Sequence, residues 1–208
     1  MLLIVGLGNP GLKYRKTRHN LGSKVLDEFR KENDFPKFKF EKKFQADINK
    51  GLINNQEVIL AKPRTFMNSS GRAVKALANY YKIPTENITV VHDDIDIPLG
   101  EIKLSQNRGA AGHKGVESII QELGTQNFTR LRLGIAPKAQ NVKRACPVGS
   151  RSDSFGETPN AKDFVLKKFS KQEKPLVEQA AKKAKQLLRK TLGGYDMKQH
   201  GFVKRTEQ

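Results

Sequence analysis

Strand-like and helix-like hydrophobic patterns alternate along the chain. Short apolar or alternating runs, rich in Val, Ile and Leu, predict β-strands. These runs cover residues 2–5, 44–48, 52–53, 58–60, 88–91, 100–104 and 130–135. Asn54 and Asn55 lie between two of them and favour the tight turn of a hairpin, and Pro63 is expected to end its second strand.

Apolar residues at helical spacing predict helices between these strands. The helical stretches are 21–33, with Asn20 near its start, 65–81, 113–123 and a long stretch after residue 170. Ser170 and Glu173 have the spacing of a capping box, and Gly193 and Gly194 are typical of a helix end. Because strands and helices alternate throughout, the pattern predicts an α/β fold.

Length and composition fit one folded domain. The chain has 208 residues, of which 37% are hydrophobic and 29% charged, which excludes a disordered or collagen-like protein. We predict a single domain over 1–192 and a basic tail over 193–208. Residues 138–161 lack periodicity and are rich in Ser, Pro and Gly, so we expect a long mobile loop there.

Cysteine usage and the lengths of the apolar runs indicate the compartment. Cys146 is the only cysteine, so no disulfide can form within the chain. No apolar run reaches the length of a membrane span, and residues 1–5 lack the basic start of a signal peptide. We therefore expect a cytoplasmic protein, or one of an organelle matrix.

Positive charge is the strongest compositional signal. Lys and Arg number 39 against 21 Asp and Glu, a formal net charge of +18 at pH 7, and much of the excess lies in 162–205. A charge of this size favours a polyanionic partner, first of all a nucleic acid. An anionic membrane surface, or a basic face that only keeps the protein in solution, would give the same count.

The segment 6–11 matches the dinucleotide-binding pattern G-x-G-x-x-G. That site needs a helix directly after the glycines and an acidic residue at the end of a second strand. Pro10 and Gly11 instead favour a turn, and Asp27 and Glu28 lie within a predicted helix. The pattern therefore gives little support to a dinucleotide site.

His19 and Asp93 are the first candidates for acid–base chemistry. His19 directly precedes a predicted helix, and Asp93 follows the strand 88–91, at the sheet edge where α/β proteins place their sites. A neutral imidazole can take a proton from water near neutral pH, and a carboxylate can orient the ring. The alternative is structural: His19 would begin the helix and Asp93 would end the strand.

Three closely spaced carboxylates offer a second possibility. Asp93, Asp94 and Asp96, with His92 beside them, could bind Mg²⁺ or Mn²⁺ in a metal-dependent phosphoesterase. On a straight strand Asp94 and Asp96 share one face and Asp93 points to the other. All three converge only if the chain turns there.

A strand-to-helix junction at 62–71 combines cations, an aromatic ring and an amide. Phe66 and Met67 fit either a substrate pocket or the core. Asn68 fits two roles: it could cap the following helix, or its amide could donate to the oxyanion that forms in ester hydrolysis.

Several segments, taken in order, resemble bacterial-type peptidyl-tRNA hydrolase over about residues 2–190. They are VGLGNPG at 5–11, TRHN at 17–20, TFMNSSG at 65–71, HDDIDIP at 92–98, RLRLGI at 130–135 and DFVL at 163–166, with Tyr14, Lys62, Pro63, Gly112, His113 and Gly115. Several blocks in one order are far more specific than any single motif. The resemblance implies a single three-layer α/β domain with a mixed, twisted sheet flanked by helices.

The family hydrolyses the ester between a peptide's carboxyl terminus and the 3′ ribose of tRNA, which recycles the tRNA. The resemblance implies that His19 activates water, that Asp93 keeps His19 basic and that Asn68 supports the developing oxyanion. Met67 and Phe66 would shape the substrate pocket. Tyr14 would line the same pocket.

Other matched positions imply recognition. Asn9 resembles the residue that separates N-blocked from free aminoacyl-tRNA, and His113 resembles a substrate-contacting loop residue. Lys103 and Arg132 fall where the family binds tRNA phosphate, which suits charge-assisted hydrogen bonds. The family needs no metal and no cofactor. The expected partner is therefore tRNA, bound by a monomer without a membrane.

Three departures from the family pattern affect these implications. Lys114 stands where the family usually has Asn, so a cation replaces an amide that would hold the substrate. Ser105 stands where a second phosphate-binding Lys is common, and Arg108 on the adjoining loop is the candidate to compensate. The segment 138–161 is longer than usual. An RNA-binding relative that does not hydrolyse its ligand is the remaining alternative, although it would be expected to lack His19, Asp93 or Asn68, and all three are present.

Overall fold

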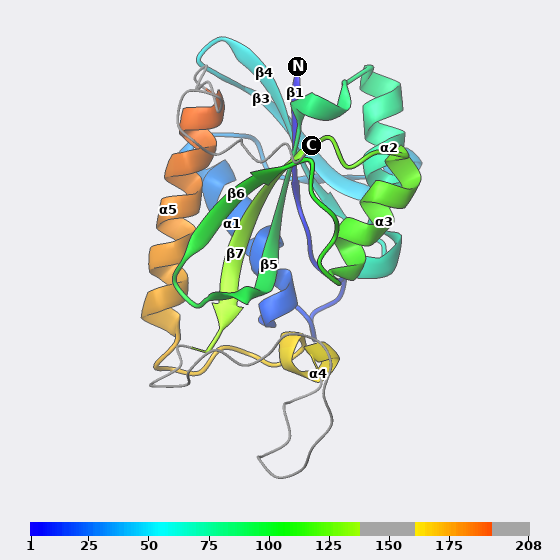
Figure 1. Ribbon diagram of the computed structural model, residues 1–208. Helices are drawn as coiled ribbons and strands as arrows, with labels where there is room; N and C mark the ends of the chain where they lie inside the picture. Colours follow the sequence, from blue (N-terminus) through cyan, green and yellow to red (C-terminus); the bar gives the residue numbers. More distant parts are fainter. Residues whose placement is uncertain (138–160, 193–208) are drawn as a thin grey trace, which may run out of the picture.

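Seven strands form one mixed sheet at the centre of the protein (Figure 1). This computed structural model describes residues 1–137 and 161–192. The strands are β1 Leu2–Gly6, β2 Lys39–Glu41, β3 Ala46–Ile53, β4 Gln56–Pro63, β5 Ile88–Pro98, β6 Ile102–Gln106 and β7 Thr129–Ala136. Their order across the sheet is β2-β3-β4-β1-β5-β7-β6. The central strands β4, β1, β5 and β7 run parallel, and the pairs β2–β3, β3–β4 and β6–β7 are antiparallel.

Helices cover both faces of this sheet. They are α1 Leu21–Glu32, α2 Ser70–Tyr81, α3 Lys114–Leu123, α4 Ala161–Val165 and α5 Lys174–Leu192, with short 3₁₀ turns η1 Arg18–Asn20, η2 Lys42–Phe44, η3 Met67–Ser69 and η4 Thr85–Asn87. In Figure 1, α1 and α5 lie on one side of the sheet and α2 and α3 on the other. The predicted α/β fold with a mixed sheet between helical layers is confirmed.

Strand alternation divides the core between the two faces. Ile4 of β1 packs in the cluster that contains side chains of α1 and α5, whereas Leu3 and Val5 pack in the cluster that contains side chains of α2 and α3. Because both faces of the central strands are buried, these strands read as continuous apolar runs in the sequence. No helix within the described part of the chain is long and apolar enough to cross a membrane.

The hairpin turn and the capping box that the sequence predicts are both present. Asn54 and Asn55 have φ values of 51° and 61°, as a tight hairpin turn between β3 and β4 requires. The capping box also forms: the Ser170 N–H donates to Glu173 Oε2 at 2.7 Å, and the Glu173 N–H donates to Ser170 Oγ at 3.3 Å. The helix α5 follows at Lys174.

Several predicted boundaries are wrong. The second helix begins at Ser70 rather than near Thr65, because the chain first passes through η3. Phe44 lies in η2 instead of a strand, and β6 begins at Ile102 rather than residue 100. The strand predicted at 88–91 continues to Pro98. The polar residues 92–96 hide this extension, since they lack the apolar pattern of a buried strand.

Two short elements, β2 and α4, were not predicted from the sequence. β2 has three residues, and none of its side chains is buried, so no hydrophobic alternation marks it. α4 begins at Ala161, which the predicted mobile loop over 138–161 had included. The rest of that loop, the predicted helix end at Gly193 and Gly194, and the tail over 193–208 lie outside the described residues.

Gly22 tests how closely α1 approaches the sheet. A Cβ at this position would meet the carbonyl oxygen of Val91 in β5. Alanine normally stabilises a helix relative to glycine, but here we expect Gly22→Ala to lower the free energy of unfolding by about 1–3 kcal/mol through overpacking. Urea unfolding checks this. Gly109→Ala is the control, because a Cβ there meets nothing within 4 Å, and an equal loss in both variants would contradict the packing argument.

Candidate active site

The candidate site lies at the carboxyl ends of the parallel strands β4, β1 and β5. The loop after β1 leads into η1, which carries His19, and η3 follows β4. β5 carries Asp93, and His113 is the N-cap of α3. Segments far apart in the sequence therefore meet at the edge where α/β sheets place their sites.

The carboxylate of Asp93 forms hydrogen bonds with two histidine rings. Nδ1 of His19 lies 3.0 Å from both carboxylate oxygens of Asp93. Nε2 of His113 lies 3.2 Å from Asp93 Oδ1. The centroids of the two rings are 4.8 Å apart, and only 2% of the Asp93 side chain is exposed. The predicted pairing of His19 with Asp93 is therefore present, and His113 joins it.

The surrounding hydrogen bonds indicate where the ring protons are. Nδ1 of His113 accepts the N–H groups of Gly115 and Val116 at 3.2 and 3.3 Å, so its proton is on Nε2, which faces Asp93. A carboxylate only accepts hydrogen bonds, so Nδ1 of His19 also carries a proton. Nε2 of His19 is then left with a free lone pair, which is the form that a general base needs.

Asp93 is kept ionised in spite of its burial. Burial raises the pKa of this carboxyl, but the charge and hydrogen bond of His19 and those of His113 outweigh burial and hold the pKa well below its usual range. A permanently charged Asp93 can orient His19 and stabilise the imidazolium that forms when the ring takes up a proton.

His92 lies behind this pair. Nδ1 of His92 donates to the carbonyl oxygen of Asp93 at 2.7 Å, and the ring meets His113 edge to face with centroids 4.6 Å apart. Its Nε2 is buried and has no hydrogen-bond partner among the described residues. Burial, together with the nearby His113, lowers the pKa of His92 well below its ordinary value, so the ring is neutral.

His19, Asp93 and His113 also have the spacing of a metal site. One ligand atom of each lies within 4.8 Å of the others, and among residues 1–137 and 161–192 this is the only such group of three. However, both ring nitrogens that face Asp93 carry protons, and Nδ1 of His113 already accepts two N–H groups. A metal would have to displace these protons, so the arrangement fits a hydrogen-bonded network better than a metal centre.

The neighbouring carboxylates are used elsewhere. Asp94 Oδ2 pairs with Arg132 Nε at 2.6 Å, and Asp94 Oδ1 accepts the N–H of Asp96 at 3.0 Å. Asp96 is exposed. The geometry therefore gives no support to a metal site built from Asp93, Asp94 and Asp96.

Asn9 ties together three loops of the site. Its Oδ1 accepts the N–H of Met67 at 2.8 Å, and its own N–H donates to Asn20 Oδ1 at 3.0 Å. Asn20 Nδ2 returns a hydrogen bond to the carbonyl of Asn9 at 2.9 Å. Asn20 thus bonds the glycine-rich loop rather than capping α1 with its side chain. Because Oδ1 of Asn9 is occupied, its Nδ2 donor is the group left for a ligand.

The glycine-rich loop does not form a dinucleotide site. Turns occupy residues 10–16, and α1 begins only at Leu21, so no helix N-terminus follows the glycines directly.

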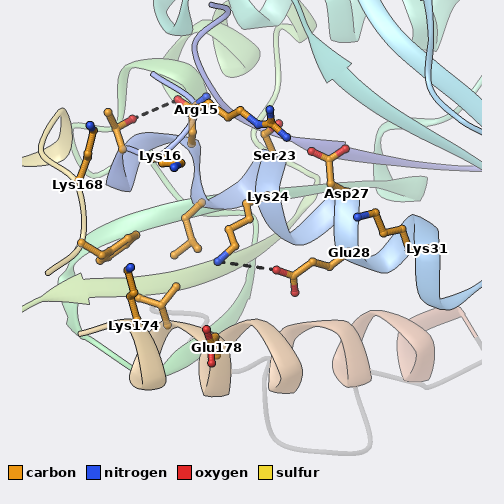
Figure 2. Close-up of a pocket in the computed structure, with 15 residues that line it drawn as sticks. Arg15, Lys16, Ser23, Lys24, Asp27, Glu28, Lys31, Lys168, Lys174 and Glu178 are labelled. Carbon is orange, nitrogen blue, oxygen red and sulfur yellow. Dashed lines mark hydrogen bonds and ion pairs between the residues drawn. The ribbon is translucent and has the colours of Figure 1, made fainter. Parts of the chain in front are cut away.

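Two cavities lie beside the histidine pair rather than on it. The larger, about 710 Å³, is a groove between α1 and α5 that Lys24 and Lys31 line from α1 and Lys174 and Glu178 from α5 (Figure 2). The smaller, about 490 Å³, is lined by residues 8–12 and 62–64, so it adjoins Asn9. His19 lines neither cavity. The candidate active site is therefore located by the two ring nitrogens that bond Asp93, and not by the size of a cavity.

Comparison with known proteins identifies the family. The family model for peptidyl-tRNA hydrolase matches residues 3–208. The chain belongs to the peptidyl-tRNA hydrolase family. The prediction of a hydrolase from this family is therefore confirmed.

Relatives of the family match nearly the whole chain. The peptidyl-tRNA hydrolase of Levilactobacillus brevis is 40% identical over 199 residues, 96% of this chain and 97% of its own. That of Bacillus subtilis is 38% identical over 184 residues, covering 88% of each. The crystal structure of the Acinetobacter baumannii enzyme has a TM-score of 0.80 at 31% identity, over 93% of this chain and 89% of that one.

Further positions that the family pattern predicts lie in η3 and in the turn before η1. Met67 is buried in η3, in the core cluster under α2 and α3, whereas Asn68 and Phe66 beside it are exposed. Tyr14 lies in the turn before η1, and the Nζ of Lys13 is 4.8 Å from the centroid of its ring. No hydrogen bond within the described residues joins Asn68 or the Tyr14 ring to His19, so their roles stay predictions.

Lys114 forms an ion pair within its own helix. It is the first residue of α3 and is exposed, and its Nζ lies 3.0 Å from Glu117 Oε2 on the same helix. The salt bridge gives this side chain a local partner on the helix surface. A substrate contact by Lys114 stays a prediction.

The predicted phosphate-binding residues come together on β6 and β7. Lys103 and Arg132 are directly opposite each other in the antiparallel pair, and Arg108 lies on the loop that follows β6. Arg130, two residues before Arg132, is buried and donates to the carbonyl of Gly109 at 2.7 Å. Burial, with the charge of Arg132, lowers the pKa of Arg130 to about 10. Arg130 therefore fixes the loop that carries Arg108.

Sequence reasoning missed Asn20, His92 and Arg130. Asn20 belongs to the block 17–20 but was predicted only to lie near the start of a helix, because its contact with Asn9 is a tertiary one. Arg130 lies two residues from Arg132, the spacing that puts both on one face of a strand. That spacing was the available signal.

His92 makes stability depend on pH. Because its pKa is lowered in the folded state, the stabilisation is present above the unfolded pKa of about 6.5 and is lost as the pH falls below it. One proton is worth about 1.4 kcal/mol per pH unit there. The unaltered protein loses free energy of unfolding when the pH falls from about 7 to about 5.5. In His92→Gln we expect this loss to be smaller by about 1 kcal/mol, because the titrating ring is gone. Urea unfolding at both pH values measures this, and parallel losses would contradict a neutral buried His92.

Proposed function

We propose that this member of the peptidyl-tRNA hydrolase family hydrolyses the ester between a peptide and the 3′ ribose of tRNA, with His19 as the general base. One observation carries the proposal: both carboxylate oxygens of Asp93 lie 3.0 Å from Nδ1 of His19. This contact holds the ring in the tautomer whose Nε2 can accept a proton. No hydrogen bond within the described residues occupies Nε2.

The chemical steps use groups of this chain alone. Nε2 of His19 takes a proton from water, and the hydroxide oxygen attacks the ester carbonyl. Asp93 stabilises the imidazolium that results. Asn68 donates its amide to the oxyanion, and its exposed position in η3 leaves that amide open to a substrate. The imidazolium then returns the proton to the 3′ oxygen of the ribose as the ester bond breaks.

Asn9 supplies the selectivity for N-blocked substrates. Its Oδ1 is held by the Met67 N–H, so its Nδ2 is the side-chain group left to donate to a ligand. A peptide carbonyl oxygen can accept from this donor, whereas a free α-amino group is itself a cationic donor and cannot. Phe66 and Tyr14 would provide apolar walls, with Met67 beneath them. His113 would act indirectly, by sharing Asp93 with His19.

Transfer RNA is the proposed partner, bound through the cationic face of β6 and β7. Lys103, Arg108 and Arg132 would contact phosphate groups with little reading of bases, since shape and backbone charge are sufficient for a stem. We further propose that the enzyme acts as a monomer in the cytoplasm, and needs neither metal nor cofactor.

Replacing the base or its partner should stop turnover. We expect His19→Ala to lower kcat by about 10²–10⁴-fold, the usual contribution of a general base, while the Kd for tRNA stays the same. Asp93→Asn should have a similar effect, because its amide offers one acceptor to two N–H groups and forces one ring into the wrong tautomer. Single-turnover kinetics and tRNA binding measure these effects. Full activity of His19→Ala would reject the proposed role.

Substrate choice separates the proposed function from its rivals. Release of tRNA is compared for N-acetylated and unblocked aminoacyl-tRNA at low salt with a chelator present. Rapid cleavage of only the blocked ester supports the proposal. Loss of activity in chelator would favour a metal-dependent phosphoesterase, and salt-sensitive binding without cleavage would favour an RNA-binding protein.

Lys103 should contribute to the salt dependence of tRNA recognition. We expect Lys103→Gln to raise KM and to lower the slope of log KM against log salt concentration by about 1, as for one lost phosphate contact. Lys39→Gln is the matched control: Lys39 is also exposed, but it lies on β2, the opposite edge strand of the sheet. An equal change in both variants would mean that net charge alone, not this face, recruits tRNA.

A further inference from the structure

The turn that carries His19 is joined to a segment about 150 positions later in the chain. Thr17 pairs with Lys168 as an isolated antiparallel bridge, and the Arg18 N–H donates to the carbonyl of Lys167 at 3.0 Å. This partner segment, residues 166–173, connects α4 to α5. In Figure 1, α4 lies just beyond the carboxyl ends of the strands, below the site.

Arg18 makes most of this junction. Its side chain is only 7% exposed, and it pairs with Glu173 Oε1 at 2.6 Å while also donating to the carbonyl of Lys168 at 2.7 Å. Its guanidinium lies over two rings, 4.5 Å from the centroid of Phe164 and 4.8 Å from that of Phe169. A buried, doubly stacked and paired guanidinium has little freedom to move.

Glu173 has two tasks at once. One carboxylate oxygen holds Arg18, and the other accepts the N–H of Ser170 in the capping box before α5. The start of α5 and the turn η1 are therefore fixed by one side chain. If Glu173 is removed, Arg18 keeps a buried positive charge without its carboxylate partner.

His19 directly follows Arg18, so the position of Arg18 sets where the His19 backbone lies. The ring itself is held at its far end by Asp93. A general base works only when its nitrogen is within hydrogen-bond reach of the attacking water, and small misplacements are costly. Nε of Arg18 is buried, and no group in residues 1–137 or 161–192 forms a hydrogen bond with it. A buried donor without a hydrogen bond lowers the free energy of unfolding, so selection for stability alone does not account for Arg18 at this position.

We propose that Arg18 and Glu173 are positioning residues for His19, through which the segment between α4 and α5 holds the general base in register with Asp93. The inference rests on the proposed function. Neither residue touches the substrate. Both act through the backbone of η1.

The test uses the full chain and two substitutions at Glu173. We expect Glu173→Ala to lower kcat for N-acetylated aminoacyl-tRNA by about 10-fold or more, with KM nearly unchanged, because binding groups stay in place and the base does not. Glu173→Gln keeps an oxygen for Arg18 or Ser170 and should recover most of the lost rate. The hydrogen-bonded Nδ1 proton of His19, observed by NMR, should broaden or shift in Glu173→Ala.

A matched ion pair elsewhere controls for stability. Nζ of Lys185 in α5 lies 2.8 Å from Glu28 Oε2 and 2.5 Å from Glu32 Oε1, which lie about two and three turns into α1. Lys185→Met should lower the unfolding midpoint and leave kcat and the His19 proton unchanged. Arg18→Lys combined with Glu173→Ala should cost no more in kcat than the worse single variant, since the pair acts as one unit.

The outcomes separate this inference from the proposed function. Unchanged kcat and an unchanged His19 signal in a folded Glu173→Ala variant, while His19→Ala is inactive, overturn only the positioning role. Equal losses of kcat in Glu173→Ala and Lys185→Met also overturn it, because general destabilisation then explains both. An active His19→Ala variant overturns the proposed function, and the inference with it.

Discussion

The buried carboxylate of Asp93 is the constraint on which the site depends. A charge in this position is costly unless N–H groups satisfy it, and its two donors come from different layers of the fold. His19 arrives on the turn that enters α1, and His113 arrives at the start of α3. Satisfying one carboxylate therefore fixes two loops against β5. The same contacts decide which nitrogen of His19 is free to act as a base.

Further hydrogen bonds and an ion pair hold the loops on either side of His19 in place. Asn20 and Asn9 exchange two hydrogen bonds, and Asn9 reaches Met67 on the turn before α2. On the other side of His19, Arg18 connects the turn to the segment before α5. The turn that carries His19 has only three residues, yet side chains from both sides of the sheet support it. This suits a reaction whose rate depends on the placement of one nitrogen.

The charged groups around Asp93 and those on β6 and β7 are arranged differently. Near Asp93 two histidine rings each direct a ring N–H at the buried carboxylate, which leaves Nε2 of His19 without a hydrogen bond from the described residues. Along β6 and β7 the cations are partly exposed, and Arg130 is buried to hold the loop of Arg108 in place. Concentrating cations on one sheet face attracts a polyanion without placing a competing charge against the base. In the proposed function, recognition and chemistry are therefore carried out by different parts of the molecule.

The sequence by itself determined the α/β class, the central strands, the hairpin at Asn54 and Asn55 and the capping box before α5. Each of these depends on local spacing and backbone preference, which are written in neighbouring residues. The ordered blocks also indicated His19, Asp93 and the family. Only the tertiary structure decided that His113 shares Asp93, that Asn20 binds Asn9 instead of capping its helix, and that Arg18 meets Glu173. Those contacts join residues distant in the chain, and no local pattern specifies which buried polar groups will satisfy one another.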